Sequence, residues 1–175
     1  EEEIIKEVWN HTGLEEGIRH PLAYVMEACD DIAYSVIDAE DTVKKGYASF
    51  YDLMDHLLSH DKLDPVIIDV TEKSKEKNIE FKKENLSSRE LNDISMQMFR
   101  VKAISEMVTA ATTTFVENIS EIMAGDIEPG FELIKNSSCA SLCKGLKDFD
   151  NLNGFQHKEV LKIELEGNNY IDNMM

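Results

Sequence analysis

The longest regular pattern in the sequence is an apolar residue at every third or fourth position across residues 91–122. The pattern occupies positions 91, 94, 98, 101, 104, 108, 111, 115, 119 and 122. This spacing places the side chains along one face of an α-helix. Ser87 and Glu90 form a capping box before the pattern, and Gly125 follows it. The sequence therefore predicts one long helix, at roughly residues 90–124, that buries an apolar face.

Other segments also carry helical signals. Pro21 suits a first helical position, Gly46 suits a helix end, and Ser49 suits an N-cap. An apolar run at 65–70 lacks a partner strand, so we expect a helical turn or an extended loop, and the Lys- and Glu-rich stretch after it predicts an exposed connection or surface helix. Further helices are expected at 3–11, 21–45, 49–60, 138–149 and 157–174. These segments predict an all-α fold, a helical bundle.

Composition limits the classes of partner. The 175 residues suffice for one domain with a core. A net charge of −17 disfavours non-specific binding of nucleic acid or anionic membrane by this segment. No apolar run approaches the about 18 residues of a membrane span, so no membrane partner is expected. Three cysteines favour a reducing, cytoplasmic compartment, and Cys139 and Cys143 are expected to be small buried hydrophobes instead of a zinc site.

Residues 27–41, "EACDDIAYSVIDAED", hold six carboxylates and no Lys or Arg. Like charges one turn apart destabilise a helix by a few tenths of a kcal/mol per pair. One interpretation is an amphipathic helix with its charged face in water, opposite a buried apolar face. The other is a surface for a cation and a hydroxylated ligand, because carboxylates are hard oxygen donors. One stripe carries Glu27, Asp30, Tyr34, Asp38 and Asp41, and the opposite arc carries Leu22, Val25, Met26, Cys29, Ile32, Ala33, Val36 and Ile37.

The string "RHPLAYVMEACDDIAYSVIDAEDTVKKG" (residues 19–46) resembles the signature of the deoxyguanosine triphosphate triphosphohydrolases (dGTPases) of the HD-domain superfamily. "HKEVLKIELEGNNYIDNMM" at the end of the sequence is similar to a C-terminal helix of that family, and the long helical segment has the expected character. The resemblance implies that this chain is the C-terminal portion of an HD-domain phosphohydrolase. Residues 1–46 would end the catalytic core and carry the last metal-ligand helix, and residues 47–175 would form the C-terminal helical region.

The resemblance also implies roles for particular residues. Asp30 matches the last ligand of a divalent metal, Mg²⁺ or Mn²⁺. Tyr34 matches the ring that packs beside the deoxyribose and excludes a 2′-hydroxyl, and Asp38 matches the carboxylate that reaches the 3′-hydroxyl. Arg100, in the long helix, is a candidate phosphate or sugar contact, or equally an Arg whose stem covers apolar surface.

The resemblance places the remaining metal ligands, a His and a His-Asp pair, and the catalytic His and Glu before this signature. Only 29 residues precede Asp30, and they hold no His-Asp pair. The lone His60-Asp61 follows the signature and is interpreted as a loop dipeptide. We therefore expect no catalytic residue within this chain and an incomplete metal site.

The function that the resemblance implies is hydrolase activity in nucleotide metabolism. A dNTP, with dGTP the first candidate, would be cleaved to deoxynucleoside and triphosphate by a full-length homo-oligomer, while this fragment alone would be inactive. Two alternatives stay open. One is a non-catalytic helical interaction domain whose acidic face binds a basic partner. The other is an HD phosphohydrolase with another nucleotide preference, because base selectivity is not visible in these residues.

Overall fold

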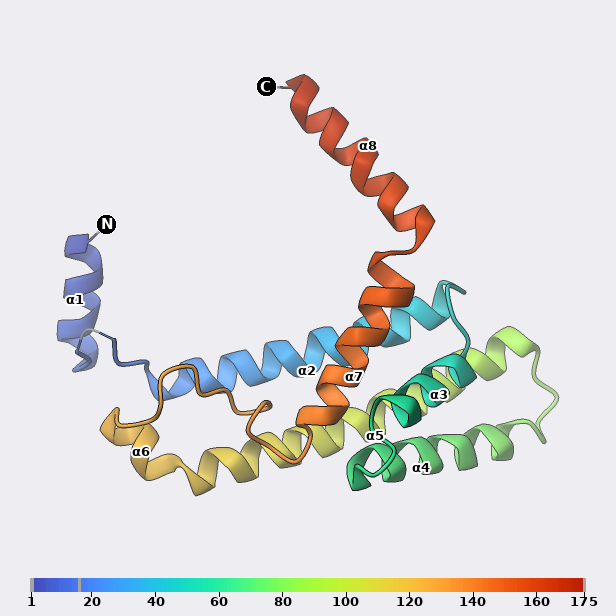
Figure 1. The fold of residues 1–175 in the computed structure, drawn as a ribbon, viewed down its shortest axis with the longest axis horizontal. Helices are drawn as coiled ribbons and strands as arrows, with labels where there is room; N and C mark the ends of the chain where they lie inside the picture. The colour runs from blue at the N-terminus through green and yellow to red at the C-terminus, as the bar shows by residue number, and fades with distance from the viewer. Residues whose placement is uncertain (1, 16, 175) are drawn as a thin grey trace.

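A computed structural model describes residues 2–15 and 17–174, and in this part of the chain every regular element is a helix (Figure 1). The all-α prediction is confirmed. Among the described residues no helix has both the length and the apolar character that crossing a membrane requires. The elements are α1 (Glu2–Thr12), α2 (Pro21–Lys44), α3 (Phe50–His60), α4 (Pro65–Phe81), α5 (Ser88–Glu117), α6 (Ile119–Ala124), α7 (Ala140–Phe149), the π-helix η1 (Asp150–Phe155) and α8 (Lys158–Met174).

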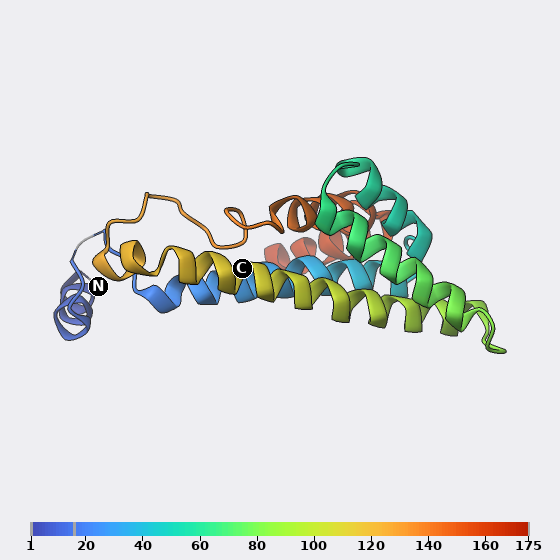
Figure 2. The same cartoon turned by 90° about the horizontal axis from the view of Figure 1, so that it is seen from below.

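The two longest helices, α2 and α5, pack against each other at the centre of the fold. Figure 2 shows them running alongside each other over most of their length, while α3 and α4 gather at one end. Helix α7 packs on α2 and α3, and η1 packs on α2 and α7. Phe50, Phe99 and Phe149 come from three of these helices and are fully buried, so one core joins α2, α3, α4, α5 and α7.

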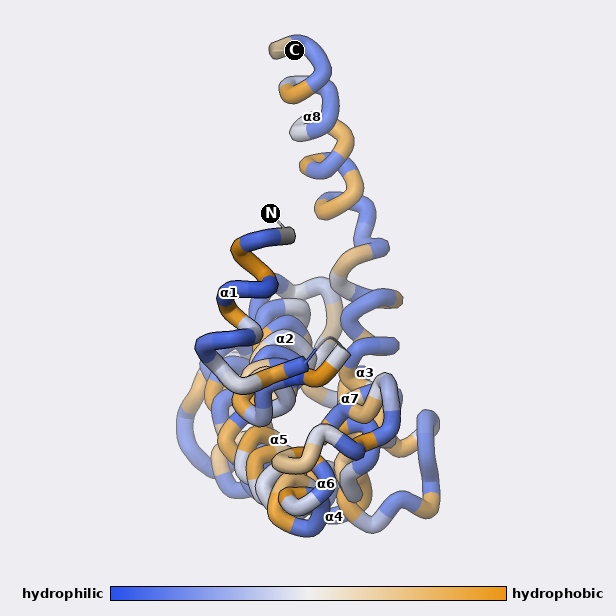
Figure 3. Tube along the Cα trace, turned by 90° about the vertical axis from the view of Figure 1, so that its left-hand side faces the viewer, coloured by the Kyte–Doolittle hydropathy of each residue, from blue (hydrophilic) through white to orange (hydrophobic). Residues whose placement is uncertain are grey.

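Helices α1 and α8 stand apart from this core. No residue of α8 is buried, and the described side chains of α1 are exposed or half-buried. Both helices project on the side of α2 opposite to α5 (Figures 1 and 3), and Figure 3 shows apolar segments along each of them. The exposed apolar residues of α8 are Leu161, Ile163, Leu165, Tyr170, Ile171 and Met174. The face of α2 that turns away from α5 is therefore the open side of the molecule.

Residues 65–81 differ from the prediction, because they form a continuous helix that packs on α5. Its buried face includes Thr71, Ser74 and Asn78, so its apolar periodicity is weak in the sequence. The Thr71 and Ser74 hydroxyl groups donate to main-chain carbonyls one turn earlier, and the Asn78 amide donates to Ser95 Oγ at 2.8 Å. These hydrogen bonds satisfy the polar groups inside the core.

The long helical pattern is also corrected in two respects. The helix breaks at Asn118, and α6 continues to Gly125, whose φ of 77° ends it as the sequence predicted. The predicted apolar face is rotated from the true core face, since Val101 and Val108 are exposed. The buried residues of α5 are Ser95, Met96, Phe99, Ala103, Met107, Ala110, Ala111 and Thr114. The predicted apolar positions and the residues that are buried both recur every three or four positions. Which of the two faces of α5 is buried therefore depends on where the neighbouring helices pack.

Candidate functional site

The N-terminus of α2 is fixed by local chemistry. His20 has extended backbone, and its Nδ1 accepts a hydrogen bond from Leu22 N at 3.2 Å. Pro21, which lacks an N–H, occupies the first helical position. His20 is therefore the N-cap of α2, and its side chain faces the helix terminus instead of a ligand.

The residues predicted as a site lie along the exposed side of α2. Asp30 and Tyr34 are exposed, the latter at 61%, and Asp38 is half-buried. Steps of four residues place the three side chains on one face, turned away from α5. The buried side of the helix is Tyr24, Ala28, Ile32, Ser35, Val36, Ala39, Glu40, Thr42 and Val43.

The apolar arc expected opposite the acidic stripe is only partly buried. Ile32 and Val36 are in the core, as expected. The prediction of a buried apolar face was wrong for five other residues of the arc, whose side chains are exposed. These are Leu22, Val25, Met26, Cys29 and Ile37. Val25 and Cys29 line a cavity with residues of α5 and so lie at the edge next to that helix. Met26 and Ile37 lie beside the acidic residues on the open side of α2. This surface is less polar than the water-facing side of an ordinary amphipathic helix.

The two members of the Asp30-Asp31 doublet have different surroundings. Asp31 lies 2.5 Å from Lys147 Nζ of α7 and is half-buried. Asp30 is exposed, and within the described part of the chain no hydrogen bond or ion pair involves its side chain. Asp30 is therefore the carboxylate of the doublet that is available to an external cation.

A divalent metal needs several oxygen, nitrogen or sulfur ligands around one point. No group of three or more His, Cys, Asp or Glu side chains in 2–15 and 17–174 is arranged to hold an ion. Asp30 alone supplies a single carboxylate, whereas Mg²⁺ requires six oxygen ligands. The residues present do not fit a complete metal centre.

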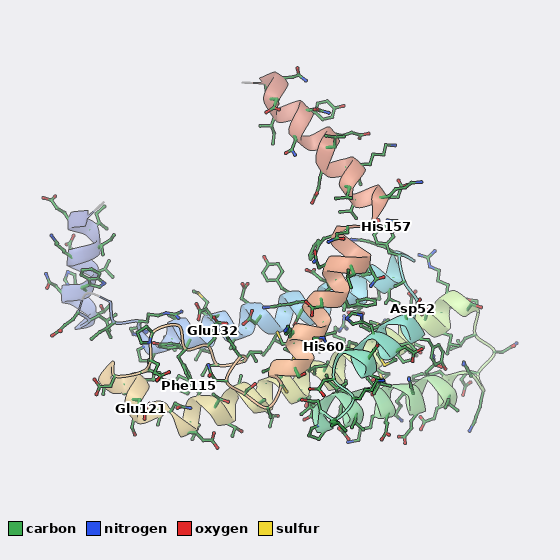
Figure 4. The ribbon with its side chains drawn as sticks, in the orientation of Figure 1. Asp52, His60, Phe115, Glu121, Glu132 and His157 are labelled. Carbon is green, nitrogen blue, oxygen red and sulfur yellow. The ribbon has the colours of Figure 1, made fainter. Side chains whose placement is uncertain are left out.

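Asp38 borders a small cavity of about 110 Å³ between α2 and the junction of η1 with α8. Burial and the neighbouring Asp41 raise the pKa of Asp38, while Lys45 lowers it. The Tyr47 ring stacks on His157 with ring centroids 3.9 Å apart, and Figure 4 shows His157 at the base of the projecting α8. The lining residues are Asp38, Asp41, Thr42, Lys45, Tyr47, Gly154, Phe155 and Val160.

Asp150, the first residue of η1, was not found by the sequence analysis. It is 2% exposed, and its Oδ1 has no hydrogen-bond partner. Burial, followed by the charge of Asp38, raises the pKa of Asp150 to about 8. The sequence offers only the polar run "DNLNG" as a signal, because the burial of Asp150 depends on the packing of η1 against α2.

The Arg100 guanidinium group forms an ion pair with a carboxylate of this chain. Its Nη1 donates to Glu40 Oε2 at 2.7 Å, and the Glu40 side chain is 2% exposed. Lys44 Nζ lies 2.7 Å from the other carboxylate oxygen of Glu40. The guanidinium group thus joins α5 to α2. A role for Arg100 in substrate binding stays a prediction.

A second cavity, of about 520 Å³, is lined by three lysines and by three carboxylates, those of Asp31, Glu132 and Asp148. Lys144 and Lys147 come from α7, and Lys135 comes from the segment before that helix; Asp31 lines the same cavity. These lysines were not singled out from the sequence. The only sequence signal for this grouping is that Lys144 and Lys147 are three positions apart, which places them on one face of α7.

The His60-Asp61 dipeptide lies at the end of α3, near α7 (Figure 4). His60 Nδ1 is 3.6 Å from Asp148. The Asp61 carboxylate accepts hydrogen bonds from Ser141 Oγ and from the main-chain N–H of Leu63, each at 3.1 Å. Both side chains have structural partners within the chain. His60 is the last residue of α3 and Asp61 is its C-cap, so the loop interpretation is wrong for His60.

No family model matches the chain. A probable deoxyguanosinetriphosphate triphosphohydrolase of Pseudomonas aeruginosa is 31% identical over 183 residues, an alignment that takes in all of this chain. The chain belongs to the deoxyguanosinetriphosphate triphosphohydrolase family. Two further dGTPases, from Yersinia pestis and Klebsiella pneumoniae, are 31% and 30% identical, again over the whole chain.

The chain spans about a third of the length of these dGTPases, with 36% of the first and 34% of the other two covered. The resemblance seen in the sequence is confirmed at the level of the family. The roles of Asp30, Tyr34 and Asp38 stay predictions.

Proposed function

We propose that this chain is part of a metal-dependent enzyme that hydrolyses a deoxynucleoside triphosphate, with dGTP as the first substrate to test. The products are the deoxynucleoside and inorganic triphosphate. The names of the relatives support this substrate class. The enzyme would be a cytoplasmic homo-oligomer with an HD-type core, of which residues 1–46 contribute the last ligand helix and residues 47–175 the adjoining helical region.

The observation that carries the proposal is the alignment of Asp30, Tyr34 and Asp38 on one open helix face. Asp30 has no partner in the described residues, while its neighbour Asp31 is paired with Lys147. The Asp30 carboxylate is therefore free to bind a cation, whereas the Asp31 carboxylate is occupied by Lys147. Mg²⁺ or Mn²⁺ would need further ligands from polypeptide outside these 175 residues, so we assign no reaction step to the metal.

The remaining residues of the face would bind and orient the sugar. The Tyr34 ring is exposed, and it would lie against the deoxyribose and occupy the space of a 2′-hydroxyl. Asp38 would accept a hydrogen bond from the 3′-hydroxyl, one turn further along α2.

The test compares Asp30→Asn with Asp31→Asn in the full-length enzyme. Loss of a metal ligand should lower activity by more than the about 100-fold that loss of an outer-shell partner costs. Asp31→Asn breaks the Lys147 pair and should retain activity within a few fold, because that pair is half-exposed. Equal activity of the two variants would reject the assignment of Asp30.

A second comparison concerns the sugar. Tyr34→Ala should raise the use of GTP relative to dGTP, whereas Tyr34→Phe should keep the discrimination, because the ring supplies the steric exclusion. If both Asp30→Asn and Tyr34→Ala hydrolyse dGTP normally but lose binding to a basic peptide, the chain is an acidic interaction domain instead.

A further inference from the structure

The junction between α7 and α8 is unusual, because η1 is a π-helix. Such turns are rare and occur frequently at functional sites. This one packs on α2 so closely that a Cβ on Gly154 would lie 2.6 Å from Thr42 Oγ1. One turn earlier on each helix are Asp150 and Asp38. The two carboxyl groups thus lie on helices that pack against each other, and the charge of Asp38 contributes to raising the pKa of Asp150.

Asp150 lacks the partners that normally accompany a buried carboxylate. Its Oδ1 has no hydrogen-bond partner, and no ion pair is formed by Asp150 within the described residues. An isolated buried carboxylate is costly, so the group takes up a proton instead. Consistent with this, burial and the charge of Asp38 raise the pKa of Asp150 to about 8.

The charged groups on the elements around Asp150 do not change this conclusion. On α2, Asp38 and Asp41 are acidic, and Lys45 lies 3.6 Å from Asp41. The charges on the adjacent turn of α7 are engaged elsewhere, Lys147 with Asp31 and Asp148 with His60. At the start of α8, the charged residues Lys158 and Glu159 are exposed, and the ring of His157 is stacked on Tyr47.

We propose that Asp150 is a positioning residue for Asp38. As a neutral acid it donates a hydrogen bond to the Asp38 carboxylate when Asp38 accepts the 3′-hydroxyl of the sugar. This inference rests on the proposed function, which assigns the sugar to Asp38. Two adjacent carboxyl groups that share one proton carry a single negative charge and do not repel each other. Asp38 then keeps one oxygen for the protein and presents the other to the ligand.

The experiment measures KM and kcat for dGTP between pH 6.5 and 9.5 in the full-length enzyme and in four variants. In the wild type, KM should rise above about pH 8 by up to about tenfold per pH unit, because substrate binding requires the protonated Asp150. Asp150→Asn keeps a donor and cannot ionise, so its KM should be independent of pH, with kcat little changed. Asp150→Leu, neutral and without a donor, should have a KM that is independent of pH and higher than that of the wild type below about pH 8.

Asp148→Asn is the matched control, because it alters a half-exposed carboxylate on the preceding turn and should leave the KM profile unchanged. Thermal unfolding at each pH verifies that every variant is folded. A carboxyl ¹³C NMR titration of the 175-residue chain gives a readout without catalysis, in which one carboxyl group should stay protonated up to about pH 8 and be missing in Asp150→Asn.

Asp38→Asn separates the two proposals. If this variant binds dGTP normally, the sugar assignment in the proposed function fails. If Asp38→Asn raises KM while Asp150→Asn keeps the wild-type rise of KM with pH, only the positioning role of Asp150 is overturned. Normal KM in Asp150→Leu would overturn it equally.

Discussion

The guanidinium group of Arg100 on α5 and the buried carboxylate of Glu40 on α2 are joined by a hydrogen bond of 2.7 Å. Lys44 approaches the same carboxylate from one turn along α2. The two longest helices of the fold are thus connected by a charged cluster at the edge of the core. Removal of one partner leaves a buried charge with less compensation, which is strongly destabilising.

Arg100→Met should therefore lower the free energy of unfolding by about 2 kcal/mol, since Lys44 still compensates part of the charge on Glu40. Urea denaturation at pH 7 measures this change. The double variant Glu40→Gln/Arg100→Met should recover part of the loss, because it removes the buried charge. Lys45→Ala, which breaks an exposed pair with Asp41, should cost less than about 1 kcal/mol. Unchanged stability in Arg100→Met, together with weaker nucleotide binding, would favour the substrate contact instead.

The raised pKa of Asp150 predicts a pH dependence of stability. The unfolded group has a pKa near 3.8 and the folded group about 8, so between these values the folded chain holds one proton more than the unfolded chain. The free energy of unfolding then falls as pH rises, by up to about 1.4 kcal/mol per pH unit. Above about pH 8 both states are ionised, and the contribution has been lost.

Asp150→Asn removes this term and serves as the comparison. From pH 5 to pH 8 the free energy of unfolding of the wild type should fall relative to that of the variant. Above pH 8 the difference between the two proteins should stay constant. The partly buried Asp38 shifts in the same direction and remains in both proteins. Parallel stability curves for the two proteins would show that Asp150 is ionised in the fold.

The contact between η1 and α2 predicts the effect of adding one methyl group. Gly154→Ala places a carbon 2.6 Å from Thr42 Oγ1 and should destabilise the chain by about 1–3 kcal/mol. Thr42→Ala removes the oxygen and should restore much of the loss in the double variant. Gly167→Ala in α8 is the control, because nothing lies within 4 Å of its added carbon, and it should be neutral or slightly stabilising. Thermal unfolding compares the four proteins, and equal effects at the two glycines would exclude close packing at η1.

The 175-residue chain alone should not hydrolyse dGTP and should bind Mn²⁺ weakly. The reason is that Asp30 has no companion ligands in the described residues. Isothermal titration calorimetry with Mn²⁺ and a chromatographic assay of deoxyguanosine release measure the two properties. Asp30→Asn should lower even the weak Mn²⁺ binding, whereas Asp61→Asn should not. Rapid hydrolysis by the isolated chain would contradict the expectation that further ligands lie outside it.

Much of the helical organisation was predictable because helix ends are determined by nearby residues. The Ser49 and Ser87 caps are both complete capping boxes in the structure, closed by residues three positions later. Gly125 adopts a positive φ at the end of α6. Such contacts span a few residues and leave a direct signal in the sequence.

The features that were missed depend on residues far apart in the chain. Arg100 and Glu40 are 60 positions apart, and Lys147 and Asp31 are 116 apart. The polar inner face of α4 and the rotation of α5 likewise follow from which helices come together. In the candidate site, the spacing of Asp30, Tyr34 and Asp38 was readable on one helix. Asp150 was not, because its burial arises only when η1 meets α2.

The exposed α8 has a thermodynamic consequence. A helix of 17 residues without buried side chains is held mainly by its own main-chain hydrogen bonds, and an isolated helix of that length is marginal in water. Its amide protons should therefore exchange with solvent far faster than those of α5. Any contact that covers its apolar residues also supplies the free energy that keeps the helix ordered, so association and helix formation at this end of the chain are coupled in one equilibrium.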